Sequence, residues 1–168
     1  MEYVVLVDEQ DNETGTMEKL QAHMEGRLHR AVSVLIYNSE GELLLQQRAA
    51  GKYHSANLWT NTCCSHPRPG ETAGHAAERR LREEMGLNCE LKEAFSFIYK
   101  AHLDSGLTEY ELDHVFTGIC DMVPVPDPME ASAWKFVSMA HLKTDMEANP
   151  EQYTEWFKIL IKRVPGGI

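Results

Sequence analysis

The stretch from Glu71 to Met85 constrains the fold most, because only there does the chain carry an unambiguous helical pattern. At about 100° per residue, one apolar stripe is formed by Ala73, Ala77, Leu81 and Met85. Gly86 follows directly, and glycine commonly ends a helix because it adopts the left-handed conformation without strain. We therefore predict a helix over 71–85 that buries this stripe against a second layer of structure.

Two charged side chains of this helix lie where a solvent-facing pair would not be expected. Arg80 and Glu84 fall along the edge of the apolar stripe, whereas Arg79 and Glu83 lie about 100° away on the outer side. One interpretation is an ordinary i,i+4 ion pair at the surface, which stabilises a helix only slightly. The other is that Arg80 and Glu84 belong to a functional site.

The rest of the chain mixes strands and helices without a regular βαβ alternation. Strands are predicted at Tyr3–Val7, Val32–Tyr37, Glu42–Arg48, Leu58–Thr60, Cys89–His102, Leu107–Cys120 and Ala133–Val137. Further helices are predicted at Thr16–Glu25, Ser138–Met146 and Pro150–Lys162. The second and third strands read as a hairpin, and the segment 49–70 is mostly irregular. This pattern predicts a single α+β domain over 1–168, a mixed sheet flanked by helices.

Composition and charge argue against several classes of protein. The chain has 26 acidic and 16 basic residues, a formal net charge of −10, and would repel phosphate backbones, so we expect no nucleic-acid binding. The longest apolar run, Val32–Tyr37, is far shorter than the ~20 residues that cross a bilayer. The N-terminus lacks the basic region of a signal peptide. We therefore expect a cytoplasmic protein whose four cysteines are free thiols.

Three histidines and two glutamates stand at spacings that suit a metal site. They are His23, His29, His66, Glu109 and Glu111. His23 and His29 can reach one ion only if the chain becomes irregular between them, as Gly26 allows, while Glu109 and Glu111 alternate in a strand and share one face. Each alone has an ordinary alternative, a surface histidine or a solvated strand face. Together they suit a five- or six-coordinate divalent ion, Mn²⁺, Zn²⁺ or Mg²⁺, rather than a closed tetrahedral zinc site.

The residues over 65–87 resemble the Nudix box, the signature G-x5-E-x7-R-E-U-x-E-E-x-G-U in which U is aliphatic. The matching positions are Glu71, Arg79, Leu81, Glu83, Glu84, Gly86 and Leu87. Two positions depart from the box: Ser65 replaces the opening glycine, and Arg80 replaces a metal-binding glutamate. Losing that carboxylate argues against a multi-metal hydrolase of the usual Nudix kind, and a guanidinium suits phosphate instead.

Further motifs extend the resemblance over nearly the whole chain. Thr60–Pro67 reads TNTCCSHP, Arg27–His29 precedes it, and Glu109–Glu111 follows the box. In this order the motifs resemble the type I isopentenyl-diphosphate delta-isomerase family, from Tyr3 to the region of Trp156. The resemblance implies a Nudix-like fold. It also implies that isopentenyl diphosphate is converted to dimethylallyl diphosphate in isoprenoid biosynthesis, by the addition of one proton and the removal of another.

The resemblance implies four residues at the reacting carbon atoms. Cys64 and Glu111 match the catalytic cysteine and glutamate, and which of them protonates the alkene stays open. Tyr99 matches a tyrosine that hydrogen-bonds this glutamate, and Trp156 matches a tryptophan that covers the alkene. Without the resemblance, either aromatic is an ordinary core residue. Cys63 is a rival to Cys64 by adjacency, but the two-residue spacing to the following histidine favours Cys64.

The resemblance also implies two metal ions and a cationic substrate site. The first ion, Mn²⁺ or Zn²⁺, takes His23, His29, His66, Glu109 and Glu111. The second, Mg²⁺, takes Glu84 and the backbone carbonyl of Cys64 and bridges the diphosphate. The cations that match the diphosphate site are Lys19, Arg48, Lys52 and Arg80. No flavin, nucleic acid or membrane is implied, and we expect a monomer or a weak dimer.

Two other functions stay open on the residues alone. A Nudix hydrolase would cleave a nucleoside or prenyl diphosphate, although Arg80 and the pairing of Cys64 with His66 argue against it. A non-catalytic module would bind metal or prenyl diphosphate without turnover.

Overall fold

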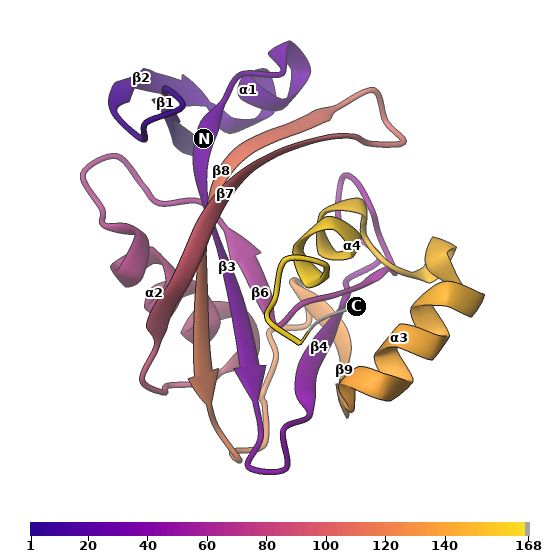
Figure 1. Cartoon of the computed structure of the whole chain (residues 1–168). Helices are drawn as coiled ribbons and strands as arrows, with labels where there is room; N and C mark the ends of the chain where they lie inside the picture. The colour runs from indigo at the N-terminus through magenta and orange to yellow at the C-terminus, as the bar shows by residue number, and fades with distance from the viewer. Residues whose placement is uncertain (167–168) are drawn as a thin grey trace.

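The fold is built around a mixed sheet whose central strand is β3 (His29–Tyr37). The computed structural model describes residues 1–166 (Figure 1). Within them the other strands are β1 (Tyr3–Val7), β2 (Glu13–Glu18), β4 (Leu43–Arg48), β5 (Trp59–Thr60), β6 (Cys63–Ser65), β7 (Lys92–His102), β8 (Thr108–Ile119) and β9 (Ala131–Val137). One edge of β3 pairs in parallel with β8 over the whole strand. Its other edge contacts β1 at the start, β6 in the middle and β4 at the end.

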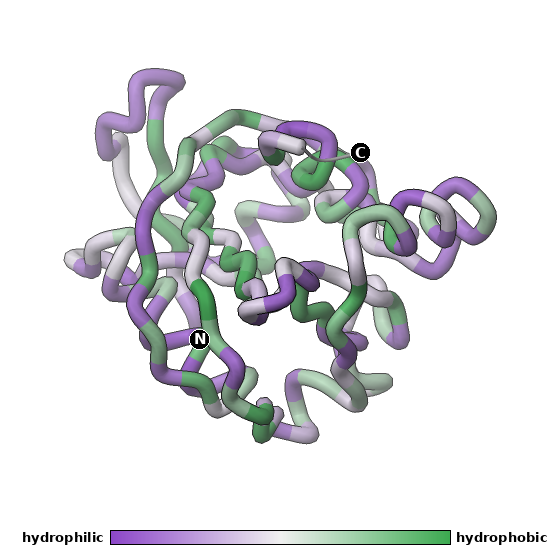
Figure 2. Tube along the Cα trace, turned by 60° about the horizontal axis from the view of Figure 1, so that its bottom comes forward, coloured by the Kyte–Doolittle hydropathy of each residue, from purple (hydrophilic) through white to green (hydrophobic). Residues whose placement is uncertain are grey.

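Helices cover both faces of this sheet (Figure 1). They are α1 (Lys19–Glu25), α2 (Ala73–Met85), α3 (Met139–Ala148) and α4 (Glu155–Ile161), with a short 3-10 turn, η1 (Pro150–Gln152). Alternate residues of β3 serve the two faces: Val34 and Ile36 pack with α2, and Leu35 packs with α3 and α4. A strand buried on both faces reads as a nearly continuous apolar run, as residues 31–36 of β3 do. Figure 2 shows green, hydrophobic stretches on central segments of the tube and mostly purple, hydrophilic colour on the loop that protrudes at the upper left. The predicted α+β class is confirmed. Within residues 1–166 no helix is long and apolar enough to cross a membrane.

Helix α2 follows its sequence prediction closely. Thr72 caps its start, where its hydroxyl accepts a hydrogen bond from the backbone N–H of His75 at 3.2 Å. Gly86 ends it with φ +64°. Glu84 is buried while Glu83 is exposed, so the predicted separation is confirmed for the two glutamates. It is not seen for the two arginines, because Arg79 and Arg80 are equally half-buried and both pair with Glu83.

The predicted hairpin of Val32–Tyr37 with Glu42–Arg48 is only partly formed. The turn is present, but β3 and β4 pair at a single position. Thr62 lies between them, because its hydroxyl accepts from the backbone N–H of Ile36 at 3.0 Å and donates to the carbonyl of Leu44 at 2.7 Å. Periodicity indicates two strands here, but it cannot indicate that a distant segment separates them.

Three other sequence expectations are corrected. Within Thr16–Glu25 the first residues belong to β2, and the helix begins at 19 with the side chain of Glu18 as its cap. Pro150–Lys162 is not one helix, because Tyr153 is extended and bridges Trp59, which separates η1 from α4. The segment 49–70 also contains β6, which pairs with β3. In each case pairing with another strand supplies backbone partners that local propensity does not reveal.

Glu71 joins the proline-containing loop to helix α2. Its two oxygens accept from Nε and Nη2 of Arg79 at 2.7 and 2.8 Å, and the backbone N–H of Arg68 donates to it at 2.9 Å. The hydrogen bonds from Arg79, which outweigh partial burial, lower the pKa of Glu71 to about 2. This side chain therefore fixes the start of α2 relative to the loop before it.

We expect Glu71→Gln to lower the free energy of unfolding at pH 7 by about 1–2 kcal/mol, since hydrogen bonds to charged groups contribute about that much. Because the pKa of Glu71 is lower in the folded state than its ordinary value of 4.5, this stability is complete above that pH and is lost as the pH falls towards 2. Urea unfolding at pH 7 and at acid pH measures it. Glu78→Gln, on the exposed side of α2, is the control. A difference that does not shrink in acid would contradict this assignment.

Candidate functional site

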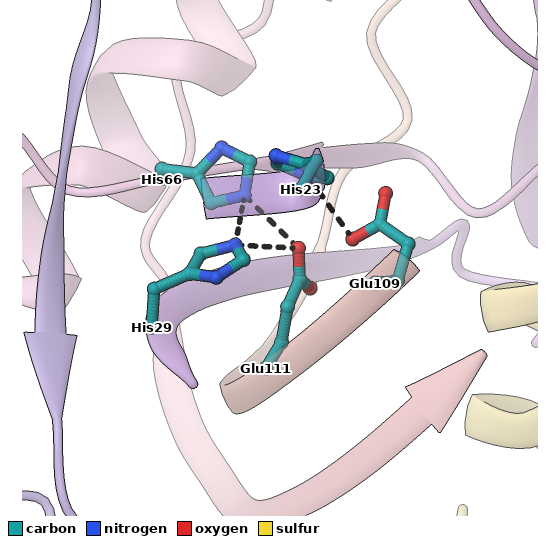
Figure 3. A group of neighbouring side chains, drawn as sticks. All are labelled: His23, His29, His66, Glu109 and Glu111. Atoms are coloured by element: carbon teal, nitrogen blue, oxygen red, sulfur yellow. Dashed lines mark hydrogen bonds and ion pairs between the residues drawn. The ribbon is translucent and has the colours of Figure 1, made fainter. Parts of the chain in front are cut away.

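Five potential metal ligands from distant parts of the chain meet near the start of β3 (Figure 3). The cluster comprises His23, His29, His66, Glu109 and Glu111, whose ligand atoms all lie within 4.8 Å of one another. His29 begins β3 directly opposite Glu111 in β8. His23 lies in the last turn of α1, and Gly26, at φ +63°, turns the chain back towards β3. This left-handed glycine is the irregularity that a shared ion requires.

Backbone carbonyls fix the direction of two imidazole rings. Nδ1 of His23 donates to the carbonyl of Lys19 at 2.6 Å, and Nδ1 of His29 donates to the carbonyl of Arg27 at 2.8 Å. In each ring Nε2 is therefore the nitrogen left to face the cluster. A histidine that ligates a metal is commonly held in this way by its other ring nitrogen.

The donor set fits a divalent cation. Nε2 of His23 and Oε2 of Glu109 are buried, 3.5 Å apart, and neither has a hydrogen-bond partner among residues 1–166. Nε2 of His66 lies 3.3 Å from Nε2 of His29 and 2.9 Å from Oε1 of Glu111. Burial and the neighbouring carboxyl raise the pKa of Glu109. A cation would satisfy these atoms and allow both carboxylates to ionise together, and imidazole with carboxylate suits Mn²⁺ or Zn²⁺.

The cluster opens into a cleft of about 230 Å³ that gathers nearly all the predicted site residues. Those that line it are Lys19, His23, Arg48, Lys52, Cys64, His66, Arg80, Glu84, Tyr99, Glu109, Glu111 and Trp156. His29 does not line the cleft. It is fully buried behind the cleft, where it contacts two other members of the cluster, Glu111 and His66.

Cys64 faces the cleft and Cys63 does not. The Cys64 thiol donates to Oδ1 of Asn61 at 2.9 Å and accepts from the indole N–H of Trp156 at 3.2 Å. Burial raises the pKa of the Cys64 thiol, so it stays protonated at neutral pH. Cys63 is fully buried in the hydrophobic core beneath α2. The choice of Cys64 over Cys63 is thus consistent with the direction of the two side chains.

Glu111 is held from the neighbouring strand. Tyr99 lies opposite it in β7, and the phenol donates to Oε2 of Glu111 at 2.6 Å. Burial alone would raise the pKa of Glu111, but its interactions with Glu109, His29 and Tyr99 hold it below its ordinary value. The Glu111 carboxylate is therefore ionised and oriented.

Acidic side chains pair with three of the four cations predicted for the diphosphate site, Lys19, Lys52 and Arg80. Arg80 donates to Glu84 at 2.7 Å and lies 3.2 Å from Glu130, which also pairs with Lys52. Lys19 pairs with Glu2 at 2.6 Å, and the guanidinium of Arg48 lies 5.1 Å from the ring centre of Trp156. An anionic ligand would replace Glu2 and Glu130 as the partner of these cations.

Several residues of the cleft were not anticipated from the sequence. Gln46 donates to Glu84 at 2.8 Å. His54 is buried with its ring edge-on to Trp156, 5.7 Å between centroids, and 3.8 Å from a carboxylate oxygen of Glu109. No periodicity marks either residue. Their only sequence signal is proximity to Arg48 and to the TNTCCSHP motif.

Comparison with known proteins agrees with this geometry. The family model described as NUDIX domain matches residues 27–157. An isopentenyl-diphosphate Delta-isomerase 2 of Aromatoleum aromaticum is 54% identical over 161 residues, which cover 96% of this chain and 85% of the relative. The isopentenyl-diphosphate Delta-isomerase of Pectobacterium atrosepticum is 53% identical over 162 residues, which cover 96% of this chain and 90% of the relative. The chain belongs to the isopentenyl-diphosphate Delta-isomerase family.

Solved structures place this family member within the Nudix fold. DR0079 from Deinococcus radiodurans aligns with a TM-score of 0.80 and 20% identity, covering 98% of this chain and all of that one. A MutT protein from Methanosarcina mazei aligns with a TM-score of 0.65 and 20% identity, covering 81% of this chain and 91% of that one. At such identity the likeness concerns the fold alone. The predicted Nudix-like fold is confirmed.

We expect Mn²⁺ or Zn²⁺ to bind the cluster and raise the Tm, because a ligand at 100 times its Kd stabilises the folded state by about 2.7 kcal/mol. His66→Ala removes a half-buried ligand and should weaken the affinity by roughly 100-fold or more, since even supporting residues contribute 10–100-fold. His75→Ala, on the exposed face of α2, is the matched control. Titration calorimetry measures both, and equal affinities for the two variants would rule out the cluster as the binding site.

Proposed function

We propose that the protein converts isopentenyl diphosphate to dimethylallyl diphosphate, a 1,3-allylic proton shift that moves a carbon–carbon double bond. One observation carries the proposal. A protonated thiol, Cys64, and an ionised carboxylate, Glu111, line the same cleft in a chain of this family. Such a pair provides a proton donor and a proton acceptor for the two ends of an allylic system.

The two protons move between the substrate and these two side chains. Protonation of an unactivated alkene forms a tertiary carbocation, and loss of a proton from a neighbouring carbon restores a double bond. Cys64 and Glu111 carry these two steps, and Tyr99 holds the carboxylate in position and assists the proton transfer. Trp156 presents its indole to the carbocation, a contact that contributes about 2 kcal/mol or more when water is excluded.

The diphosphate binds where four cations converge on the cleft. They are Lys19, Arg48, Lys52 and Arg80. A chain with a net charge of −10 needs such a local concentration of positive charge to bind a trianionic substrate. When the diphosphate binds, it replaces Glu2 as the partner of Lys19 and Glu130 as the partner of Lys52 and Arg80.

In this proposal the cluster of three histidines and two glutamates would hold Mn²⁺ or Zn²⁺, and Glu84 with the backbone carbonyl of Cys64 would hold Mg²⁺. When bound, such ions supply positive charge that neutralises phosphate oxygens and lowers the pKa of nearby carboxyls.

The chain acts as one domain of 168 residues in this proposal. Lys19 and His23 precede the matched range of 27–157, yet both line the cleft. All the residues that line the cleft come from one chain, so we expect a monomer or a weak dimer. We expect it to act in the cytoplasm.

Proton NMR of the protein with isopentenyl diphosphate, Mg²⁺ and Mn²⁺ in D₂O tests the activity. We expect the vinyl methylene signals to disappear as two allylic methyl signals grow and take up deuterium. Inorganic phosphate released with an unchanged alkene would instead support a Nudix hydrolase. No change in a folded, metal-loaded sample would support a binding module.

Cys64→Ala and Glu111→Gln are expected to lower kcat by about 10³-fold or more, since each removes one proton-transfer group. Cys63→Ala is the matched control for the thiol, because the adjacent side chain packs under α2 instead of facing the cleft. Circular dichroism verifies that each variant folds. An active Glu111→Gln protein would remove this residue from the catalytic role.

Lys52→Ala should raise KM about tenfold with a smaller change in kcat, since Lys52 contacts the unreactive diphosphate. Lys100→Ala, at an exposed position on β7, is the control for lost surface charge. Initial rates at several substrate concentrations separate the two constants. A fall in kcat alone would place Lys52 elsewhere than against the diphosphate.

A further inference from the structure

A fully buried amide lies against the Cys64 thiol and has no part in the proposed reaction so far. Asn61 has no exposed surface. Its Nδ2 donates to the carbonyls of Val34 at 3.3 Å and Cys63 at 2.9 Å, and its Oδ1 accepts from the hydroxyl of Thr60 at 3.0 Å and from the Cys64 thiol at 2.9 Å. All four hydrogen-bonding positions of the amide are used.

The partners settle which end of the amide faces the sulfur. Both neighbours of Nδ2 are carbonyl oxygens, which only accept, so the amide cannot be reversed without opposing lone pairs. Oδ1 therefore faces Cys64. Because an amide oxygen cannot donate, the bond between Asn61 and Cys64 exists only when the sulfur carries its proton and directs it towards Asn61.

The same amide connects the thiol to the helix that carries Trp156. Thr60, which donates to Asn61, accepts from the hydroxyl of Thr154 at 2.9 Å. Thr154 is the N-cap of α4, and Trp156 lies in the first turn of that helix. The indole N–H then donates to the sulfur of Cys64 at 3.2 Å, which closes a ring made of these hydrogen bonds and the backbone of α4 between Thr154 and Trp156.

We propose that Asn61 is a positioning residue that directs the Cys64 S–H bond and holds the sulfur at a fixed place beside the Trp156 indole. The sulfur also lies 3.9 Å from the hydroxyl of Ser33, which donates to Asp113 at 2.6 Å. Asn61 accepts the thiol proton on one side of the sulfur and Trp156 donates on a second, so the sulfur has one defined position and turns its remaining side to the cleft, which Asn61 does not line. The catalytic consequence rests on the isomerase function proposed above, whereas the orientation of the S–H bond does not.

Raman spectroscopy of the S–H stretch tests the geometry without any substrate. The Cys64 band is identified by its loss in Cys64→Ser. A thiol that donates a hydrogen bond has a lower S–H stretching frequency than a free thiol, so we expect a lowered band in the wild-type protein and an upward shift in Asn61→Ala. Thr62→Val is the control, because the hydroxyl of this buried neighbour bonds to Ile36 and Leu44 and not to Asn61 or Cys64. It should lower the Tm without moving the band.

Turnover then tests the consequence. Asn61→Ala should lower kcat by about 10²-fold with little change in KM, since small displacements of a reacting group have effects of that size. Thr62→Val should keep kcat. A wild-type band at the frequency of a free thiol overturns the proposal even if Asn61→Ala does not fold. An equal loss of kcat in both variants would assign Asn61 a merely structural role. A lowered band in a protein without isomerase activity would keep the geometry and reject the function.

Discussion

The parallel pairing of β3 with β8 is the contact on which the rest of the structure depends. It sets His29 opposite Glu111 and leaves the other edge of β3 free for three different strands. Through that edge β6 brings Cys64 and His66 to the site. The turn between α1 and β3 then returns His23 to the same place. A shift of one residue in this register would turn Glu111 to the opposite face of the sheet and remove it from the group of five ligands.

Electrostatics imposes the second constraint. The protein is acidic overall, yet its cleft places four cations within reach of an anion and two buried carboxylates among three imidazoles. Buried charges are costly unless they are paired, and Glu109 and His23 keep atoms without a hydrogen-bond partner. The cations in turn bind Glu2 and Glu130, which makes the cleft nearly neutral before an anion enters. The site is therefore stable only as a set of mutually compensating charges, and it is suited to a metal ion and a diphosphate.

Local patterns predicted much of this molecule, and their failures share one cause. Helix α2 has its own cap, stripe and terminal glycine, so nothing distant was needed to predict it. The alternation of Glu109 and Glu111 likewise determines that they share a face. By contrast, Glu13–Glu18 is polar and becomes a strand only because β1 pairs with it. The break at Tyr153 exists because Trp59 pairs with it, and the hairpin opens because Thr62 enters it.

The sequence by itself determined the chemical inventory: which imidazoles, carboxylates, cations and thiols are present, and which near neighbours must share a side. Strand alternation alone puts Cys63 and Cys64 on opposite faces. Only the tertiary structure decided that Cys64 faces the cleft, because that depends on how β6 pairs with β3 and which face α2 covers. It also decided that Asn61, His54 and Glu130 belong to the site. Their roles arise from distances between segments far apart in the chain, which no local periodicity encodes.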